Sequence, residues 1–63
     1  MPYVNIRVAG RLEKSQKEEI CQGVTEVISK VANKPESSIL IFIDECEHEN
    51  ISSGGKLLKK PTG

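Results

Sequence analysis

Apolar residues occupy every second position at the start of the chain, where Val4, Ile6 and Val8 share one face. A period of two is typical of a β-strand with one apolar side. Gly10 interrupts the alternation, so the pattern predicts a strand over residues 3–8.

From residue 13 to residue 33 the apolar residues follow the period of a helix instead. Counted from Ile20, the next apolar residues lie four, seven, eight and eleven positions later, at Val24, Val27, Ile28 and Val31. Cys21 and Ala32 lie at the edge of this apolar stripe. At about 100° per residue they share one side of an amphipathic helix. Asn33 suits a left-handed C-terminal cap and Pro35 prevents continuation. Gly23 costs about 1 kcal/mol inside such a helix, which the close approach of another backbone would explain.

Residues 38–44 form an unbroken apolar run, as expected for a strand that is buried on both faces. One face would carry Ile39, Ile41 and Ile43, and the other Leu40 and Phe42. A polar segment over residues 45–50 follows. Gly54-Gly55 then predicts a turn within a short hairpin, and we expect a flexible tail over about residues 57–63.

Strand, helix and strand together predict one α+β domain over residues 1–63, a single βαβ unit with two parallel strands, one long helix and a short C-terminal hairpin. One helix covers only one face of a two-stranded sheet, so Leu40 and Phe42 lack a cover and both sheet edges are open. Burying each of these side chains is worth roughly 1.5–3 kcal/mol. We therefore expect a homo-oligomer whose subunits pair through strands and stack through the uncovered sheet face.

Composition excludes several classes of partner. Nine basic and nine acidic residues cancel, and the aromatic residues are too few to stack bases, which argues against nucleic acid. The sequence shows neither a signal-peptide pattern nor an apolar run of about 18 residues, so we expect a cytoplasmic protein without a membrane span. Cys21 and Cys46 are expected as two buried thiols, although a disulfide between them stays open. No spacing suggests a metal, and we expect His48 to be solvated and no cofactor to be needed.

Pro2 is the first candidate for chemistry. Cells commonly remove an initiator methionine when so small a residue follows, and this would turn the nitrogen of Pro2 into a secondary amine. Inside the chain that nitrogen belongs to an amide and is not basic. Removal of Met1 would therefore create a base.

The segments MPYVNIRV, KSQKEEICQGVTEVISKV, KPESSILIFIDE and ISSGGK, in this order, resemble the 4-oxalocrotonate tautomerase family. The resemblance implies dimers with a four-stranded sheet, usually three of them to a hexamer. It also implies an isomerase that moves a proton in enol/keto or unsaturated 2-hydroxy/2-keto acids, with the amine of Pro2 as general base and without a cofactor.

The resemblance further implies a guanidinium for the substrate carboxylate, which is Arg11 if a one-residue gap is allowed. Without the gap Leu12 takes this place, and Arg7 is another candidate. Two positions depart from the family: Leu40 stands where well-known members have an arginine, and Ile51 where they have a bulky aromatic residue. These departures leave a second interpretation open, a non-catalytic subunit on the same scaffold that binds small molecules or other proteins.

Overall fold

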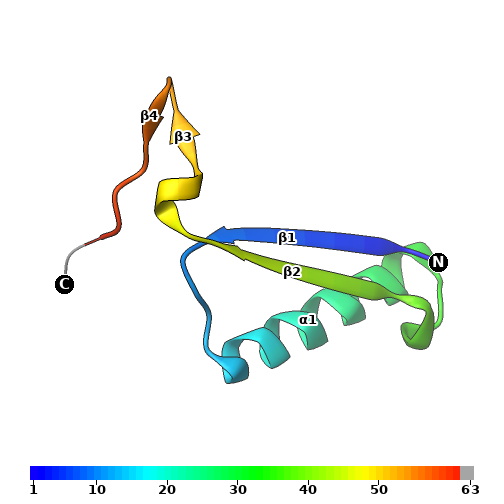
Figure 1. Cartoon of the computed structure of the whole chain (residues 1–63). Coiled ribbons are helices and arrows are strands. Elements are labelled where there is room, and N and C mark those ends of the chain that lie inside the picture. The colour runs from blue at the N-terminus through cyan, green and yellow to red at the C-terminus, as the bar shows by residue number, and fades with distance from the viewer. Residues whose placement is uncertain (62–63) are drawn as a thin grey trace.

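The computed structural model describes residues 1–61 of the 63-residue chain. Its elements, in chain order, are β1 (Tyr3–Ala9), α1 (Lys14–Ala32), the 3₁₀ turn η1 (Glu36–Ser38), β2 (Leu40–Cys46), the 3₁₀ turn η2 (His48–Asn50), β3 (Ser52–Ser53) and β4 (Lys56–Leu57). Strands β1 and β2 pair in parallel, and α1 lies along one face of the sheet that they form (Figure 1). The predicted βαβ unit and C-terminal hairpin are confirmed.

Both ends of α1 are capped, and the cap at Asn33 is the one that the sequence predicts. The side-chain oxygen of Gln16 accepts the backbone N–H of Glu13, the residue before the helix, at 2.8 Å. Asn33 closes the other end with φ 57°, and its N–H donates to the carbonyl of Ser29. A left-handed cap of this kind satisfies carbonyls that the helix itself leaves free.

Strand β2 begins and ends two residues later than the apolar run indicates. Ser38 belongs to η1, where its N–H donates to the carbonyl of Pro35 at 3.0 Å. At the other end Glu45 and Cys46, expected in a polar loop, continue the strand because Val8 and Ala9 of β1 pair with them. Strand pairing therefore sets this boundary.

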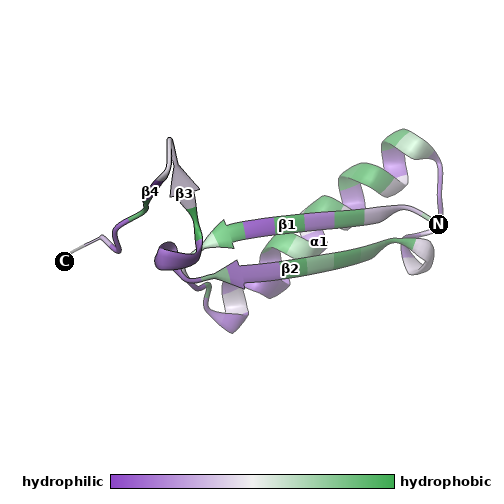
Figure 2. Cartoon of the chain, turned by 45° about the horizontal axis from the view of Figure 1, so that its top comes forward, coloured by the Kyte–Doolittle hydropathy of each residue, from purple (hydrophilic) through white to green (hydrophobic). Residues whose placement is uncertain are grey.

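The two faces of the sheet have different cover. Apolar residues of both strands line the side toward α1, where Ile39 is the one buried hydrophobic residue among residues 1–61, at 8% exposure. The other side, here called the open face, consists of Tyr3, Asn5, Arg7, Leu40, Phe42 and Asp44. Phe42 is 53% exposed there, with the Tyr3 ring edge-on at a centroid distance of 6.2 Å. Figure 2 shows apolar residues along both strands and along α1.

The chain is thin for its length. Its accessible surface is 5254 Å², against about 4,000 Å² expected for a compact protein of this mass. The radius of gyration is 14.8 Å, against about 11 Å expected. Val27 and Val31 were expected on the packed stripe of the helix, but both are exposed, Val31 to 81%. Two strands are too narrow to cover the whole apolar stripe of a 19-residue helix.

The hairpin stands away from the βαβ unit at the end where β1 finishes (Figure 1). Gly54 and Gly55 have φ 60° and 85°, the pair of positive values that a type I′ turn requires. The N–H of Leu58 donates to the carbonyl of Ile51 at 2.8 Å. Thr62 and Gly63 lie outside the described residues, and the flexible tail stays a prediction. No helix within residues 1–61 has the length and apolar character needed to cross a membrane.

Candidate active site

Pro2 lies at the entrance to β1, and the sheet holds its backbone. Its carbonyl accepts the N–H of Leu40 at 3.0 Å, and its side chain is half-buried. The nitrogen of Pro2 is joined on its other side to Met1, which is exposed. Cleavage of the Met1–Pro2 bond would therefore leave an amine whose carbonyl side is already fixed.

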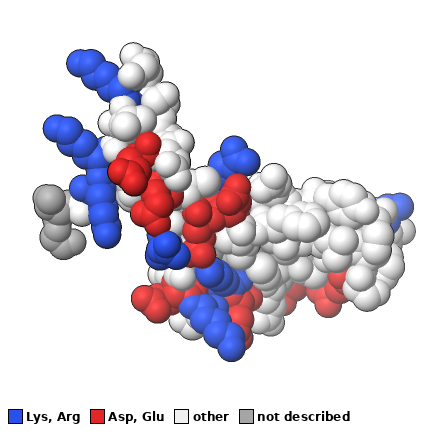
Figure 3. Space-filling view, in the orientation of Figure 1, with Lys and Arg blue, Asp and Glu red and all other residues white. Residues whose placement is uncertain are grey.

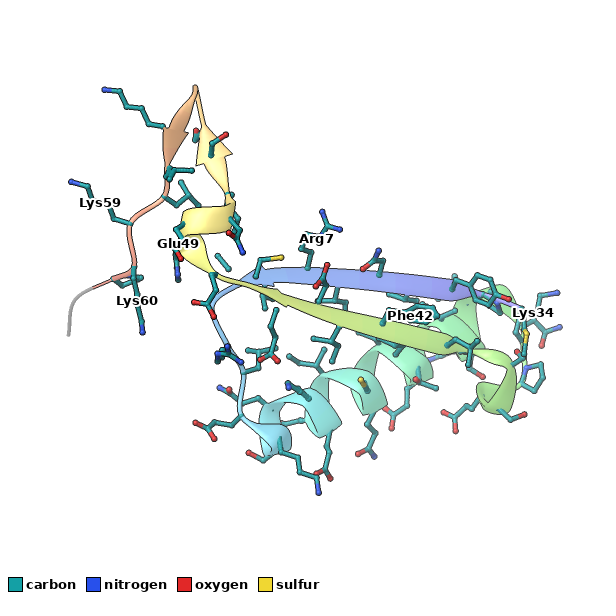
Figure 4. All side chains as sticks on the ribbon, viewed as in Figure 1. Arg7, Lys34, Phe42, Glu49, Lys59 and Lys60 are labelled. Atoms are coloured by element: carbon teal, nitrogen blue, oxygen red, sulfur yellow. The ribbon has the colours of Figure 1, made fainter. Side chains whose placement is uncertain are left out.

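The open face next to Pro2 carries apolar and aromatic side chains. Leu40 pairs with Tyr3 across the sheet, and Phe42 follows on the same open face. Figure 3 shows a broad uncharged surface over the strands in this half of the molecule, with acidic residues along its lower edge and a basic residue at its tip. Figure 4 places Lys34, which follows α1, at this same end. Positive charge at the Pro2 end thus comes from Lys34 rather than from β2.

Arg11 lies at the other end of β1. The N–H of Gly10, whose φ is 96°, donates to the carbonyl of Cys46 at 2.7 Å and turns the chain away from the strand. Arg11 is 77% exposed, and its Nη2 lies 2.9 Å from Oε1 of Glu47. Ile51 follows η2 at this end and is half-buried. Both Arg11 and Ile51 are thus placed beyond the C-terminal ends of the parallel strands.

The four residues predicted for the site therefore fall into two groups. Pro2 and Leu40 lie at one end of the sheet, Arg11 and Ile51 at the other. Pro2 and Gly10 are eight positions apart along extended chain, which corresponds to about 26 Å. A small substrate cannot contact both groups within one copy of the chain.

Arg7 and Leu12, the alternatives to Arg11, have other partners. Nε of Arg7 donates to Oδ2 of Asp44 at 3.2 Å, on the open face. Leu12 lines a hollow of about 340 Å³ together with Gln16, Glu19 and Ile20 of α1. Arg11 is thus the guanidinium beyond the strand ends, and Arg7 the one on the open face.

Glu45 is a residue that the sequence reasoning missed. Its Oε2 accepts the N–H of Leu12 at 2.7 Å, and its Oε1 accepts Nζ of Lys17 at 2.9 Å. These contacts, the Leu12 hydrogen bond first, lower the pKa of the Glu45 carboxyl from its ordinary value. Its position carried a signal, since Glu45 follows Ile41 and Ile43 on the side of β2 that faces the helix.

His48 departs from the expectation of a solvated loop residue. It begins η2, is half-buried, and its Cε1 would lie 3.3 Å from a Cβ added to Gly10. Cys21 and Cys46 are free thiols, as expected, but both are half-buried rather than buried. In the described part of the chain, no three His, Cys, Asp or Glu residues gather as a metal site would require.

The fold and the position of Pro2 define a class of small βαβ proteins with a proline at the start of the first strand. The model of the family described as "Tautomerase enzyme" matches residues 2–60, so its match begins at Pro2. A probable tautomerase from Helicobacter pylori is 36% identical over 59 residues, covering 89% of this chain and 87% of that protein. A probable tautomerase from Streptococcus agalactiae is 35% identical over 60 residues, covering 95% of this chain and all of that protein.

Solved structures agree with these relatives. The crystal structure of DmpI from Helicobacter pylori superposes with a TM-score of 0.79 at 32% identity, covering 89% of this chain and 88% of that one. A structure from an analysis of trans-3-chloroacrylic acid dehalogenase activity superposes with a TM-score of 0.79 at 26% identity, covering 92% of this chain and all of that one. The chain belongs to the tautomerase family. Membership supports tautomerase-type catalysis as the chemistry of this fold.

Proposed function

We propose that this chain is an isomerase in which the amine of Pro2, released by removal of Met1, is the general base. Its substrates are enol/keto or unsaturated 2-hydroxy/2-keto acids. The observation that carries the proposal is the position of Pro2: its carbonyl is held by Leu40 at 3.0 Å, while its nitrogen leads only to the exposed Met1. The match of the family model from residue 2 onward supports the same residue.

The proposed reaction is a proton transfer and requires no cofactor. The amine takes a proton from an enol hydroxyl or an α-carbon and returns it to another carbon of the conjugated acid. Positioned acid–base transfer of this kind contributes about 10²–10⁴ in rate, most when the pKa of the base lies near the working pH. Burial of this amine among apolar side chains would disfavour its protonated form and so lower its pKa.

We propose that the working site forms between copies of the chain. Pro2 and Gly10 are about 26 Å apart along β1, so the Arg11 that holds the substrate carboxylate comes from a neighbouring copy. A guanidinium binds a carboxylate with two parallel hydrogen bonds. The exposed Phe42 and the accessible surface, about 1,200 Å² above the compact expectation, support a homo-oligomer, either a dimer or a hexamer of three dimers.

A subunit-mixing experiment tests this arrangement. One variant keeps Arg11 but carries a residue ahead of Pro2 that is not removed, and the other keeps a free Pro2 but has Arg11→Ala. Mixed oligomers of the two should recover turnover at low substrate concentration, because a site can then combine Pro2 of one copy with Arg11 of the other. Unmixed and mixed samples with equally low activity would contradict a shared site.

The mass of the purified native protein tests the base separately. It should correspond to residues 2–63, and an ultraviolet screen of enolised 2-keto acids should detect turnover. Full activity with Met1 still attached would exclude Pro2 as the base.

The second candidate function is a non-catalytic binding subunit on the same scaffold. Leu40 favours it, because an apolar side chain beside Pro2 cannot polarise a substrate carbonyl. Binding of an enol acid without turnover by a protein that has lost Met1 would support this candidate.

We place the protein in the cytoplasm as part of the same proposal. Its two free, half-buried thiols suit a reducing compartment.

A further inference from the structure

Three consecutive residues after β1 are held by three consecutive residues at the end of β2. The carbonyl of Cys46 accepts the N–H of Gly10 at 2.7 Å, the side chain of Glu45 accepts the N–H of Leu12 at 2.7 Å, and that of Glu47 accepts from the Arg11 guanidinium at 2.9 Å. The segment 10–12 is therefore shaped by the segment 45–47.

Glu45 differs from Glu47 in its surroundings. The Glu45 side chain is only 21% exposed and has a second partner, Nζ of Lys17 on the first turns of α1, at 2.9 Å. The N-cap residue Glu13 already places one carboxylate at the start of α1, and Glu45 adds a second acidic side chain that binds Lys17 of the helix. Glu47 contacts Arg11 at an exposed position, where ion pairs contribute little.

We infer that Glu45 is a positioning residue, which fixes the backbone of residues 10–12 against α1 and thereby directs the Arg11 guanidinium toward the substrate carboxylate. The inference rests on the proposed role of Arg11. Glu45 does not touch the substrate; it acts through the N–H of Leu12, the residue next to Arg11. A charge-assisted hydrogen bond at a half-buried position holds a loop more firmly than an exposed ion pair does.

The geometry separates two effects of Glu45. Its Oε2 sets the loop backbone through Leu12, and its Oε1 neutralises Lys17. Glutamine can keep the first contact, because an amide oxygen also accepts an N–H, but it loses the ion pair. Alanine loses both contacts.

The test compares steady-state kinetics of Glu45→Ala and Glu45→Gln on an anionic enol substrate, with Arg11 present and with Arg11→Ala. With Arg11 present, Glu45→Ala should raise KM about 10-fold with a smaller change in kcat, and Glu45→Gln should restore most of the loss. In the Arg11→Ala background, Glu45→Ala should add no further change in KM. Independent, multiplicative effects of the two substitutions would overturn the inference.

Two further readouts keep the outcomes distinct. Glu49→Gln removes the same charge from an exposed side chain of η2 and should leave KM unchanged. Amide hydrogen exchange at Leu12 should quicken in Glu45→Ala but not in Glu49→Gln, and unchanged exchange would contradict the inference whatever the kinetics. If Arg11→Ala alone leaves KM unchanged while Leu12 exchange responds, the proposed role of Arg11 fails and the loop contact stands.

Glu45→Gln also covers the case in which Glu45→Ala does not fold. A glutamine side chain has the shape of the glutamate that it replaces. Lys17→Met, made separately, removes the second partner of Glu45 and keeps the first, the N–H of Leu12. Lys17→Met should leave Leu12 exchange nearly unchanged, because the Leu12 hydrogen bond remains. A KM for Lys17→Met raised as much as that for Arg11→Ala would overturn the inference, since charge at Lys17 would then matter more than the loop.

Discussion

The two ends of the β1–β2 sheet are built in different ways. At the Pro2 end, a backbone hydrogen bond from Leu40 holds the residue that we propose as the base, beside the apolar part of the open face. At the Arg11 end, charged side chains gather around the loop after β1, as Figure 3 shows. The first end suits a neutral amine and the second an anionic substrate group.

Under the proposed function, this difference means that one chain by itself makes an incomplete site. An apolar end favours the neutral base, and a charged end provides a guanidinium, but the strand separates them by about 26 Å. We propose that a second copy brings the Arg11 end of one chain to the Pro2 end of the other. The thin shape and the open face have the same consequence, because both leave apolar surface that another copy can bury.

The largest effect should come from the Pro2 end. A residue left ahead of Pro2 converts the amine into an amide and should abolish turnover. Pro2→Ala, which still presents a primary amine after removal of Met1, should lose about 10–10³-fold in kcat, since the ring no longer fixes the nitrogen. The pH profile should have one limb from this amine, with a pKa below that of an unperturbed α-amino group. A limb at the unperturbed value would show that the apolar end does not tune the base.

The open face joins the two ends, and Phe42→Ala tests it. Phe42 is half-exposed in a single copy, so a monomer should tolerate the change. If another copy covers it, the substitution should cost about 3–5 kcal/mol and shift the protein toward smaller or unfolded species. Sedimentation across a range of concentrations measures this. A stable, folded monomer of the unaltered chain would contradict the shared site.

Substitutions at the Arg11 end should affect mainly the binding of the substrate. Arg11→Ala should raise KM for an anionic enol substrate more than it lowers kcat, because the guanidinium grips the ground state and the transition state alike. Arg11→Lys keeps the charge but loses the paired hydrogen bonds. Its KM should therefore lie between that of the unaltered chain and that of Arg11→Ala. If neither parameter changes, Arg7 becomes the candidate for the carboxylate.

Acid should remove the stabilising contacts of Glu45 at the Arg11 end before it affects the apolar Pro2 end. The hydrogen bond from Leu12 and the ion pair with Lys17 hold the folded pKa of Glu45 below its ordinary value of 4.5, so the charged form stabilises the fold. This stability is fully present above pH 4.5 and is lost as the pH falls through the lower, folded pKa. The difference in Tm between the unaltered chain and Glu45→Gln should therefore shrink as the pH falls below 4.5. A difference that stays constant would contradict a carboxylate role.

The smallest effect concerns the helix that spans both ends. A Cβ added at Gly23 would have no other atom of the described residues within 4 Å, so Gly23→Ala should stabilise the chain by about 0.5–1 kcal/mol. Thermal unfolding measures the change. Destabilisation together with a smaller oligomer would indicate that another copy packs closely against this side of α1, as the sequence suggested.

Local pattern alone determined the elements of this protein. Alternation over residues 3–8, the helical stripe ending at Asn33, the apolar run and Gly54-Gly55 each depend on neighbouring residues, and each predicted element is present. The bare open face was also predictable, because Leu40 and Phe42 must point away from the helix that Ile41 and Ile43 face. Pro2 and Arg11 could be named as candidates by residue type and by resemblance.

Only the tertiary structure decided where these residues lie relative to one another. The parallel register extends β2 to Cys46 and places Glu45 against Leu12, a contact between residues 33 positions apart. It also leaves Val31 exposed, because the width of the sheet, and not the helical period, decides what is covered. The separation of Pro2 from Arg11 follows from the straight course of β1, since an extended strand keeps its two ends far apart whatever residues they carry.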